Sequence, residues 1–229
     1  MNNVAVKICG ITNYEDAALA VDLGATALGF IFAASPRQIT PPKARDIIHA
    51  IPPFVKTVGV FVNEGPAEIK EMVHYCGLDL VQLHGDESPD LCHELMPSAI
   101  KALRIKDASN IQSSLSYQGK VRALLLDTYA KDKAGGTGST FDWRLAIKIK
   151  ELGIPIILAG GLDPSNIDSA IRTVKPYAVD VNSGVEACPG KKSPMLMKDL
   201  MKKISDHQQC WGYEDVPSKG PGSRSAGGR

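Results

Sequence analysis

The chain has 229 residues, with 26 basic and 25 acidic side chains and a formal net charge of +1. Hydrophobic residues make up 44% and charged residues 22%, which is ordinary for a globular protein with a core of its own. The balanced charge argues against a generally basic nucleic-acid-binding surface, and no apolar run reaches the roughly 18 residues that a membrane helix needs. The first residues lack a basic region followed by an apolar stretch, so no signal peptide is expected.

The cysteines give no sign of a disulfide framework or a zinc site. There are five, an odd number, at irregular spacing and without a C-x-x-C pair: Cys9, Cys76, Cys92, Cys188 and Cys210. This usage fits a reducing cytoplasm. We therefore expect a cytoplasmic protein without a bound metal.

Short apolar runs alternate with longer amphipathic stretches along the chain. Eight runs are apolar on both faces, as parallel strands covered by helices are: Val4–Cys9, Ala27–Phe32, Thr57–Val62, Leu80–Leu83, Ile100–Ile105, Ala123–Leu126, Pro155–Ala159 and Ala178–Val181. Helices are predicted between most of them, several beginning with proline: Glu15–Leu23, Pro42–Ala50, Pro66–Tyr75, Pro89–Leu95, Asp142–Leu152, Pro164–Thr173 and Pro194–Ile204. The Ser-rich segment Asp107–Gln118 is a weaker helix candidate.

Strand–helix alternation with a parallel sheet leaves two architectures, an open doubly wound sheet or a closed (β/α)8 barrel. Eight strands in about 200 residues favour the barrel. Polar residues such as Cys9, His84 and Asp127 stand at the C-terminal ends of different strands, and only a barrel brings such ends to one mouth. We predict an α/β protein with a single (β/α)8 TIM-barrel domain at residues 1–205. A polar tail at residues 206–229, with little apolar content, is predicted to be disordered.

Cys9 and Asp127 are the leading candidates for acid–base chemistry. Cys9 ends the first predicted strand, and Lys7 shares its face because strand side chains alternate with a period of two. An inward lysine requires a polar partner, and its charge would help to lower the pKa of the cysteine. Asp127 directly follows an apolar run, where a carboxylate must be hydrogen-bonded or used. The structural alternatives are a small buried thiol at Cys9 and a loop cap at Asp127.

Three other polar residues lie at or near predicted strand ends. Asp180 is an acid inside an apolar strand, so the argument made for Asp127 applies to it. His84 follows the fourth strand and is as compatible with a structural hydrogen bond as with a ligand contact. Arg37 follows the second strand, either as a solvated loop charge or as a fork for a substrate carboxylate.

Glycine-rich segments follow strands six, seven and eight. Gly160 and Gly161 precede a helix, and Ser183 and Gly184 follow the last strand. Glycine lets backbone N–H groups approach an anion closely, and the last two loops of such a barrel often bind phosphate. Tight turns are the alternative explanation. The run Gly135–Gly138 offers a third N–H-rich loop that could close over a substrate.

Several motifs occur in a specific order: Lys7–Thr12, Gly29–Phe32 with Ser35–Arg37, Val81–Glu87, Leu126–Asp127, Gly135–Gly138, Leu158–Leu162 and Val181–Glu186. Together they strongly resemble the phosphoribosylanthranilate isomerase family of tryptophan biosynthesis, over about Val4 to Ile204. Each motif is weak alone, but the ordered set is specific. The chain departs from the family pattern after Lys192, where Ser193 stands in place of an acidic residue.

The resemblance implies an Amadori rearrangement that turns N-(5-phosphoribosyl)anthranilate into 1-(2-carboxyphenylamino)-1-deoxyribulose 5-phosphate, without metal or other cofactor. By matching motif, Cys9 would be the general base and Asp127 the general acid. Arg37 would contact the anthranilate carboxylate, and His84 and Asp180 would line the pocket. The phosphate would be surrounded by Gly136, Gly160, Gly161, Ser183 and Gly184. The expected partner is this small phosphorylated aminoaldose, not a nucleic acid or a membrane, and the chain would act as a monomer or homodimer.

Other barrel functions remain as alternatives. An indole-glycerol-phosphate synthase would place a lysine and a glutamate at strand ends, and no matching glutamate is found. A ribulose-phosphate epimerase would bring several metal ligands, of which only His84 is present. A non-catalytic phosphate-ligand sensor would not need both Cys9 and Asp127. Acceptance of the related histidine-pathway aminoaldose depends on the shape of the pocket.

Overall fold

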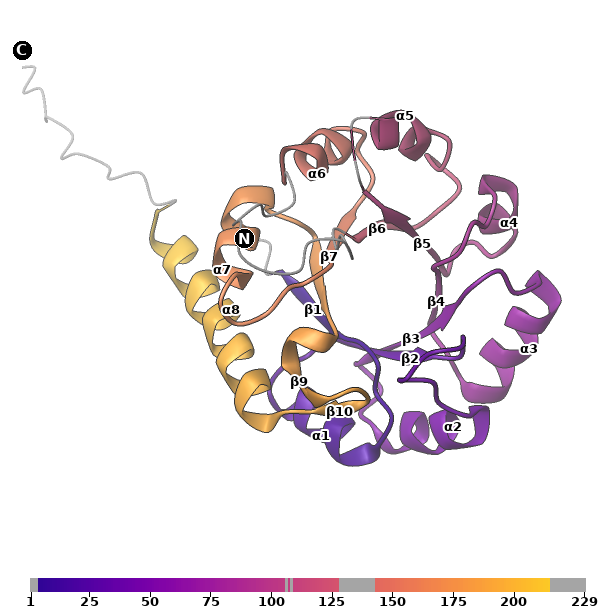
Figure 1. Ribbon diagram of the computed structural model, residues 1–229, viewed down its shortest axis with the longest axis horizontal. Helices are drawn as coiled ribbons and strands as arrows, with labels where there is room; N and C mark the ends of the chain where they lie inside the picture. The colour runs from indigo at the N-terminus through magenta and orange to yellow at the C-terminus, as the bar shows by residue number, and fades with distance from the viewer. Residues whose placement is uncertain (1–3, 106, 108, 128–142, 215–229) are drawn as a thin grey trace, which may run out of the picture.

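The computed structural model describes residues 4–105, 107, 109–127 and 143–214. Eight parallel strands close into a barrel in chain order, with β8 hydrogen-bonded to β1 (Figure 1). The strands are β1 (Ala5–Ile8), β2 (Ala27–Ile31), β3 (Lys56–Phe61), β4 (Leu80–Leu83), β5 (Ala99–Arg104), β6 (Ala123–Asp127), β7 (Ile156–Ala159) and β8 (Ala178–Val181). All eight coincide with predicted apolar runs to within a few residues, and the (β/α)8 fold is confirmed.

Helices form a ring around the outside of the strands (Figure 1). They are α1 (Tyr14–Asp22), α2 (Pro41–Ala50), α3 (Pro66–Cys76), α4 (Pro89–Glu94), α5 (Ser109–Leu115), α6 (Trp143–Lys150), α7 (Ile167–Val174) and α8 (Pro194–Glu214). The weak candidate within the Ser-rich segment forms the seven-residue helix α5. Helix α8 continues beyond residue 205, so the helical part of the chain passes the predicted domain boundary. That boundary stays a prediction, because residues 215–229 lie outside the described part.

A short excursion separates β8 from α8. It consists of the 3-10 turn η1 (Ser183–Val185) and an antiparallel pair of strands, β9 (Glu186–Cys188) and β10 (Lys191–Lys192). The sequence pattern did not predict this hairpin, because its strands are only three and two residues long. It lies beside α1, as Figure 1 shows. Ser193 accepts a hydrogen bond from the Leu196 N–H, so the serine that departs from the family pattern caps α8.

Two hydrophobic layers follow from the alternation of side chains along each strand. On β6, Leu124 and Leu126 point outward and pack in the core between strands and helices. Ala123 and Leu125 belong to a second cluster, which fills the barrel interior. Because successive side chains point to opposite faces, Asp127 lies on the inward face two residues beyond Leu125. The strand period therefore delivers this carboxylate to the mouth of the barrel.

Several inward positions near the mouth are polar rather than apolar. Lys7 on β1, Gln82 on β4 and Asp180 on β8 are at most 8% exposed. Buried polar side chains require partners, and Lys7 binds both Gln82 and Asp180. None of the helices in the described ranges is long and apolar enough to cross a membrane.

Candidate active site

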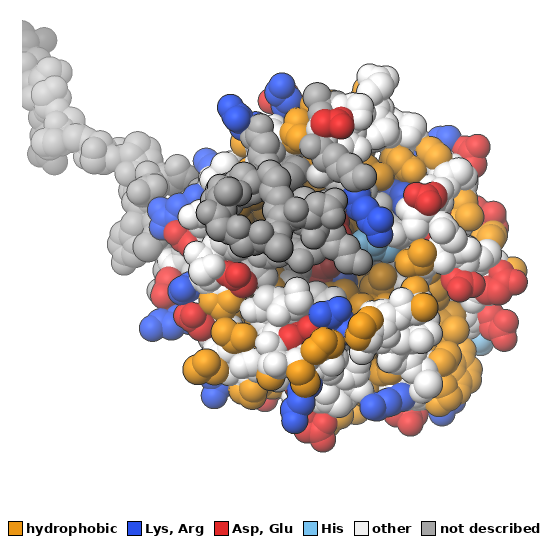
Figure 2. Space-filling view, viewed as in Figure 1, with side chains coloured by type: hydrophobic (Ala, Val, Ile, Leu, Met, Phe, Trp, Pro, Cys, Tyr) orange, Lys and Arg blue, Asp and Glu red, His pale blue; other side chains and the backbone are white. Residues whose placement is uncertain are grey.

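The polar groups at the mouth form two levels. The upper level consists of Cys9, His84 and Asp127, and the lower level consists of Lys7, Gln82 and Asp180. Cys9 directly follows β1, His84 directly follows β4, and Asp127 is the last residue of β6. Each stands two residues beyond an inward position of its own strand, so all three face the barrel axis at its C-terminal end. Figure 2 looks onto this face, where histidine and charged side chains gather near the axis beside a part covered by undescribed residues.

Lys7 is the centre of the lower level. Its Nζ atom donates hydrogen bonds to Asp180 Oδ2 at 2.9 Å and to Gln82 Oε1 at 2.8 Å. Lys7 and Asp180 are 4% and 8% exposed, so this is a buried ion pair with a polar third partner. The prediction that an inward lysine needs a partner is confirmed. The second oxygen of Asp180, Oδ1, is buried and has no hydrogen-bond partner among the described residues.

Gly29 on β2 makes room for Cys9 and Lys7. A Cβ atom at this position would lie 2.7 Å from Cys9 Sγ and 2.9 Å from Lys7 Cε. Real Cβ atoms do not tolerate such distances, so any larger residue would push the thiol or the lysine aside. A glycine in the middle of a strand often marks such a close approach.

The Cys9 thiol is only 4% exposed, and its pKa is raised above the ordinary value. Burial is the largest cause, and the negative charge of Asp180 acts in the same direction. The positive charge of Lys7 lowers the pKa, as the sequence suggested, but it does not outweigh burial. Cys9 is therefore a protonated thiol near neutral pH.

Gln82 connects the lower level to His84. Its Nε2 atom lies 2.9 Å from His84 Nδ1, and His84 Nε2 lies 3.5 Å from Asp127 Oδ2. His84 and Asp127 are about a quarter exposed, so both reach the opening of the barrel. A continuous line of polar contacts thus runs from Asp180 through Lys7, Gln82 and His84 to Asp127.

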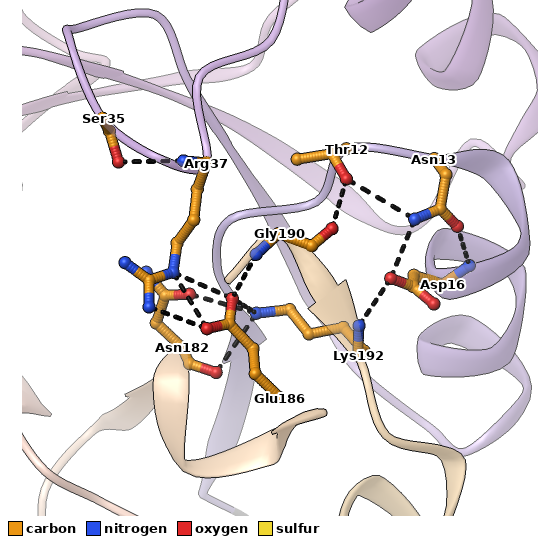
Figure 3. A network of polar contacts seen from close by, with 9 residues as sticks. All are labelled: Thr12, Asn13, Asp16, Ser35, Arg37, Asn182, Glu186, Gly190 and Lys192. Atoms are coloured by element: carbon orange, nitrogen blue, oxygen red, sulfur yellow. Dashed lines mark hydrogen bonds and ion pairs between the residues drawn. The ribbon is translucent and has the colours of Figure 1, made fainter. Parts of the chain in front are cut away.

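Arg37 belongs to a second network, drawn in Figure 3. Its Nε and Nη2 atoms bind the carboxylate of Glu186 on β9, at distances of 2.7 to 3.0 Å. The Nζ atom of Lys192 lies 3.1 Å from Glu186 Oε1. Hydrogen bonding to Glu186 raises the pKa of Arg37. Burial would raise the pKa of Glu186, but the two cations lower it below its ordinary value.

The glycine loops after β7 and β8 lie against each other. Gly160 and Gly161 both have positive φ angles, of 88° and 64°. Gly184 lies in η1, where a Cβ atom would overlap the carbonyl oxygen of Leu162 and lie 2.8 Å from Asp163 Cβ. Only glycine permits this approach, which places Ser183 and Gly184 beside the loop that carries Gly160 and Gly161. Gly136 lies outside the described residues, so its predicted role remains untested.

The sequence reasoning missed four polar residues that hold the candidate residues in place: Gln82, Asn182, Glu186 and Lys192. Gln82 carried a usable signal, because it stands two residues before His84 on the same face of a strand. Glu186 and Lys192 lie in a loop without a periodic pattern, and only their contacts reveal the connection to Arg37.

The fold and the site together define a (β/α)8-barrel enzyme with titratable side chains at the C-terminal mouth and glycine loops beside it. The sequence profile described as "N-(5'phosphoribosyl)anthranilate (PRA) isomerase" matches residues 6–203. The isomerase of that name from Geobacter sulfurreducens is 50% identical over 201 residues, covering 87% of this chain and 98% of the relative. The chain belongs to the N-(5'-phosphoribosyl)anthranilate isomerase family, and it is an isomerase.

Solved structures agree with this assignment. The phosphoribosyl anthranilate isomerase from Thermotoga maritima superimposes with a TM-score of 0.82 at 45% identity, covering 89% of this chain and 99% of the other. A second isomerase structure was solved with reduced 1-(o-carboxyphenylamino)-1-deoxyribulose 5-phosphate. It has a TM-score of 0.80, is 43% identical and covers the same shares of the two chains. The family resemblance inferred from the ordered motifs is confirmed.

Proposed function

We propose that this isomerase converts N-(5-phosphoribosyl)anthranilate to 1-(2-carboxyphenylamino)-1-deoxyribulose 5-phosphate, a step of tryptophan biosynthesis, with Cys9 as general base and Asp127 as general acid. The observation that carries the proposal is that two acid–base groups lie in the upper level of the mouth. The Cys9 thiol directly follows β1 and the Asp127 carboxylate ends β6, and both face one opening. Both groups take or give protons, which is the chemistry that this rearrangement needs.

The reaction divides into proton transfers that the two groups supply. Asp127 donates a proton to the ring oxygen while the C1–O bond breaks, and the substrate nitrogen forms an iminium with C1. The iminium acidifies the proton on C2, and the thiolate form of Cys9, which is the minor form near neutral pH, removes that proton to give an enolamine. Tautomerisation to the ketone, with loss of the O2 proton and protonation of C1, completes the rearrangement. Hydrogen moves only as protons and no atom leaves the substrate skeleton, so the scheme balances without a redox cofactor.

The remaining site residues are proposed to bind substrate. Arg37 would contact the anthranilate carboxylate, and His84 and Asp180 would line the pocket around the sugar. Among the described residues the buried oxygen Asp180 Oδ1 has no hydrogen-bond donor, and a sugar hydroxyl that donates to it would support this role. The phosphate is assigned to Gly160, Gly161, Ser183 and Gly184, with Gly136 from the preceding loop. Their close packing supports a preformed site.

We assign this activity to one domain, predicted at residues 1–205 and continued by α8 to Glu214, with the cytoplasm as the place of action. Size-exclusion chromatography with light scattering distinguishes between the monomer and the homodimer that the family resemblance allows. The partner is the small phosphorylated substrate.

Product identification tests the function. Purified protein is incubated with N-(5-phosphoribosyl)anthranilate, and the product is separated and reduced with borohydride. Before reduction we expect an isomer of unchanged mass, and borohydride should then add two hydrogen atoms at its ketone. Unchanged substrate at high enzyme concentration would contradict the proposal. The histidine-pathway aminoaldose, assayed in parallel, shows whether the pocket also accepts the larger substrate.

A further inference from the structure

The hairpin β9–β10 carries a buried ion pair whose carboxylate holds Arg37. We propose that Glu186 and Lys192 are positioning residues that aim one edge of the Arg37 guanidinium at a substrate carboxylate. They also keep the cluster formed by Arg37, Glu186 and Lys192 net positive. This inference rests on the proposed function, in which Arg37 meets the carboxylate of the substrate. It adds two residues that favour a substrate with a carboxylate, although neither residue contacts that substrate carboxylate.

The hydrogen bonds to Glu186 occupy one edge of the guanidinium. Nε donates to both carboxylate oxygens, at 2.8 and 3.0 Å, and Nη2 donates to Oε2 at 2.7 Å. A guanidinium has five N–H bonds, and this pairing uses Nε–H and one N–H of Nη2. The other three belong to Nη1 and Nη2 and form the end of the group. In Figure 3 this end points away from Glu186. It is a second fork that matches the two oxygens of a planar carboxylate.

Lys192 decides the charge of the cluster. Its side chain is fully buried, and Nζ binds three acceptors: Asn182 O at 3.1 Å, Asn182 Oδ1 at 3.0 Å and Glu186 Oε1 at 3.1 Å. Three acceptors match the three N–H bonds of a protonated ammonium. One carboxylate therefore stands between two cations, and Arg37, Glu186 and Lys192 together carry a net charge of about +1. Without Lys192, the Arg37–Glu186 pair would be neutral and would attract an anion weakly.

The hairpin is fixed to the segment that follows Cys9. The Thr12 hydroxyl donates a hydrogen bond to the Gly190 carbonyl, and the Lys192 backbone N–H donates to Asp16 Oδ2 at 2.8 Å (Figure 3). Asp16 is itself held by the side chain of Asn13, the cap of α1. The carboxylate of Asp16 thus faces backbone and amide donors, not the guanidinium.

Arg37 also passes close to the candidate base. A Cβ atom at Gly10, the residue after Cys9, would lie 3.1 Å from Arg37 Cδ and 2.6 Å from Asn182 Oδ1. The arginine stem therefore lies against the backbone next to the thiol. Through these contacts, Glu186 and Lys192 set the place of the carboxylate relative to the reacting carbon atoms.

Binding measurements with two matched ligands test the proposal. The probes are reduced 1-(o-carboxyphenylamino)-1-deoxyribulose 5-phosphate and its phenylamino counterpart, which lacks only the carboxylate. Titration calorimetry gives the affinity ratio of the two ligands for each variant. We expect wild type to prefer the carboxylate ligand by about ten- to a hundredfold, the value of a charge-assisted pair. Lys192→Met should lower this ratio by about tenfold, with the phenylamino affinity nearly unchanged. Glu186→Gln should lower it less, because the loss of the aimed guanidinium edge is partly offset by a cluster charge that rises to about +2.

A double-mutant cycle shows whether Glu186 acts through Arg37. The ratio for Arg37→Ala should not fall further when Glu186→Gln is added. Lys192→Arg, which keeps the charge, should retain more of the preference than Lys192→Met. Glu94→Gln is the matched control, because Glu94 belongs to the exposed Lys70–Glu94 pair and should leave the ratio unchanged.

The outcomes separate the two claims. If Arg37→Ala keeps the wild-type ratio, the proposed contact between Arg37 and the substrate carboxylate is wrong. If Arg37→Ala loses the preference but Glu186→Gln keeps it, the positioning role is wrong and the proposed function stands. Equal losses for both ligands in Glu186→Gln would also overturn the positioning role, because they would indicate a general structural effect. Should Glu186→Gln fail to fold, the Lys192→Met and Lys192→Arg pair decides by the same ratio.

Discussion

At the scale of single residues, the site depends on where protons reside. Lys7 donates to Gln82 Oε1, so the amide nitrogen of Gln82 must face His84 Nδ1. An NH2 group only donates, so Nδ1 must accept, and the imidazole proton belongs on Nε2, which faces Asp127. The donated hydrogen bond of Lys7 thus sets the tautomer of His84, which follows a different strand.

This tautomer is directly measurable. Nitrogen-15 NMR of the labelled histidines should show His84 with its proton on Nε2, identified by the signals lost in His84→Asn. Gln82→Glu replaces the donor by an acceptor and should bring a proton to Nδ1, whereas Gln82→Leu should leave a mixture. An Nδ1–H tautomer in wild type would contradict the hydrogen-bond assignment.

The pKa of Cys9 gives a second prediction at this scale. Burial raises it above the ordinary value of about 8.5, while Lys7 lowers it. Lys7→Met removes the lowering charge, so the pKa should rise further and the thiolate should form at still higher pH. The thiolate absorbance near 240 nm, taken as a difference from Cys9→Ala, follows the titration. A thiolate that forms below the ordinary cysteine range in wild type would refute this electrostatic description.

At the scale of elements, a further buried ion pair holds the loop that carries His84. Lys101 on β5 binds Glu87 Oε2 at 2.7 Å, and both side chains are at most 2% exposed. Glu87 also accepts hydrogen bonds from the N–H groups of Asn63 and Gly85. This pair lies outside the barrel interior, since Lys101 alternates with the inward residues Ile100 and Ala102.

Removing one partner should therefore destabilise the fold strongly. Glu87→Gln leaves a buried lysine without its anion, and we expect a loss of about 3–5 kcal/mol in the free energy of unfolding. The same change at exposed Glu94 should cost at most about 1 kcal/mol. Urea denaturation followed by circular dichroism measures both. Similar losses for the two variants would contradict the assigned difference in burial.

The pH dependence of stability follows from the same carboxylate. Burial would raise the pKa of Glu87, but Lys101 and the backbone donors lower it below its ordinary value. A lowered folded-state pKa gives stability that is present above the unfolded value of about 4.3 and is lost as pH falls through the folded value. Denaturation curves from pH 6 down to about pH 3 should decline less steeply for Glu87→Gln than for wild type. Equally steep losses of stability in Glu87→Gln and wild type would contradict the link between the Glu87 pKa and stability.

The contact between the β7 and β8 loops supplies another prediction at this scale. Gly184→Ala places a methyl group against the carbonyl of Leu162 and should push η1 away from Gly160 and Gly161. We expect KM for the phosphorylated substrate to rise more than kcat falls, because the loops bind the phosphate in this account. Initial-rate kinetics separate the two constants. An unchanged KM would contradict the assignment of the substrate phosphate to these loops.

At the scale of the whole molecule, most of the fold could be predicted from the sequence. Strands buried on both faces have a strong apolar signal, and the eight runs with helices between them favoured a closed barrel over an open sheet. Cys9, His84 and Asp127 could be placed at one mouth because strand ends and a period of two determine direction. Gly29 and Gln82 could be seen only as parts of motifs, since their roles depend on distances between strands.

The part that could not be predicted lies in the β9–β10 hairpin. Its strands are too short for a periodic pattern, and Glu186 contacts Arg37 across 149 positions of the chain. The direction in which the Cys9 pKa shifts could not be predicted from the sequence either. Lys7 and burial act on this pKa in opposite directions, and only the packed structure decides which prevails. Local pattern thus predicts which residues reach the mouth, and packing decides how they are held and charged.

The central claim is that this one barrel carries the isomerase activity through Cys9 and Asp127. The most direct test follows the fluorescence of N-(5-phosphoribosyl)anthranilate, generated in situ, as purified protein is added. We expect a decay in proportion to wild-type protein, slower by about 10²–10⁴-fold with Cys9→Ala and with Asp127→Asn. A decay as fast in both variants as in wild type, or no decay with any of the three proteins, would contradict it.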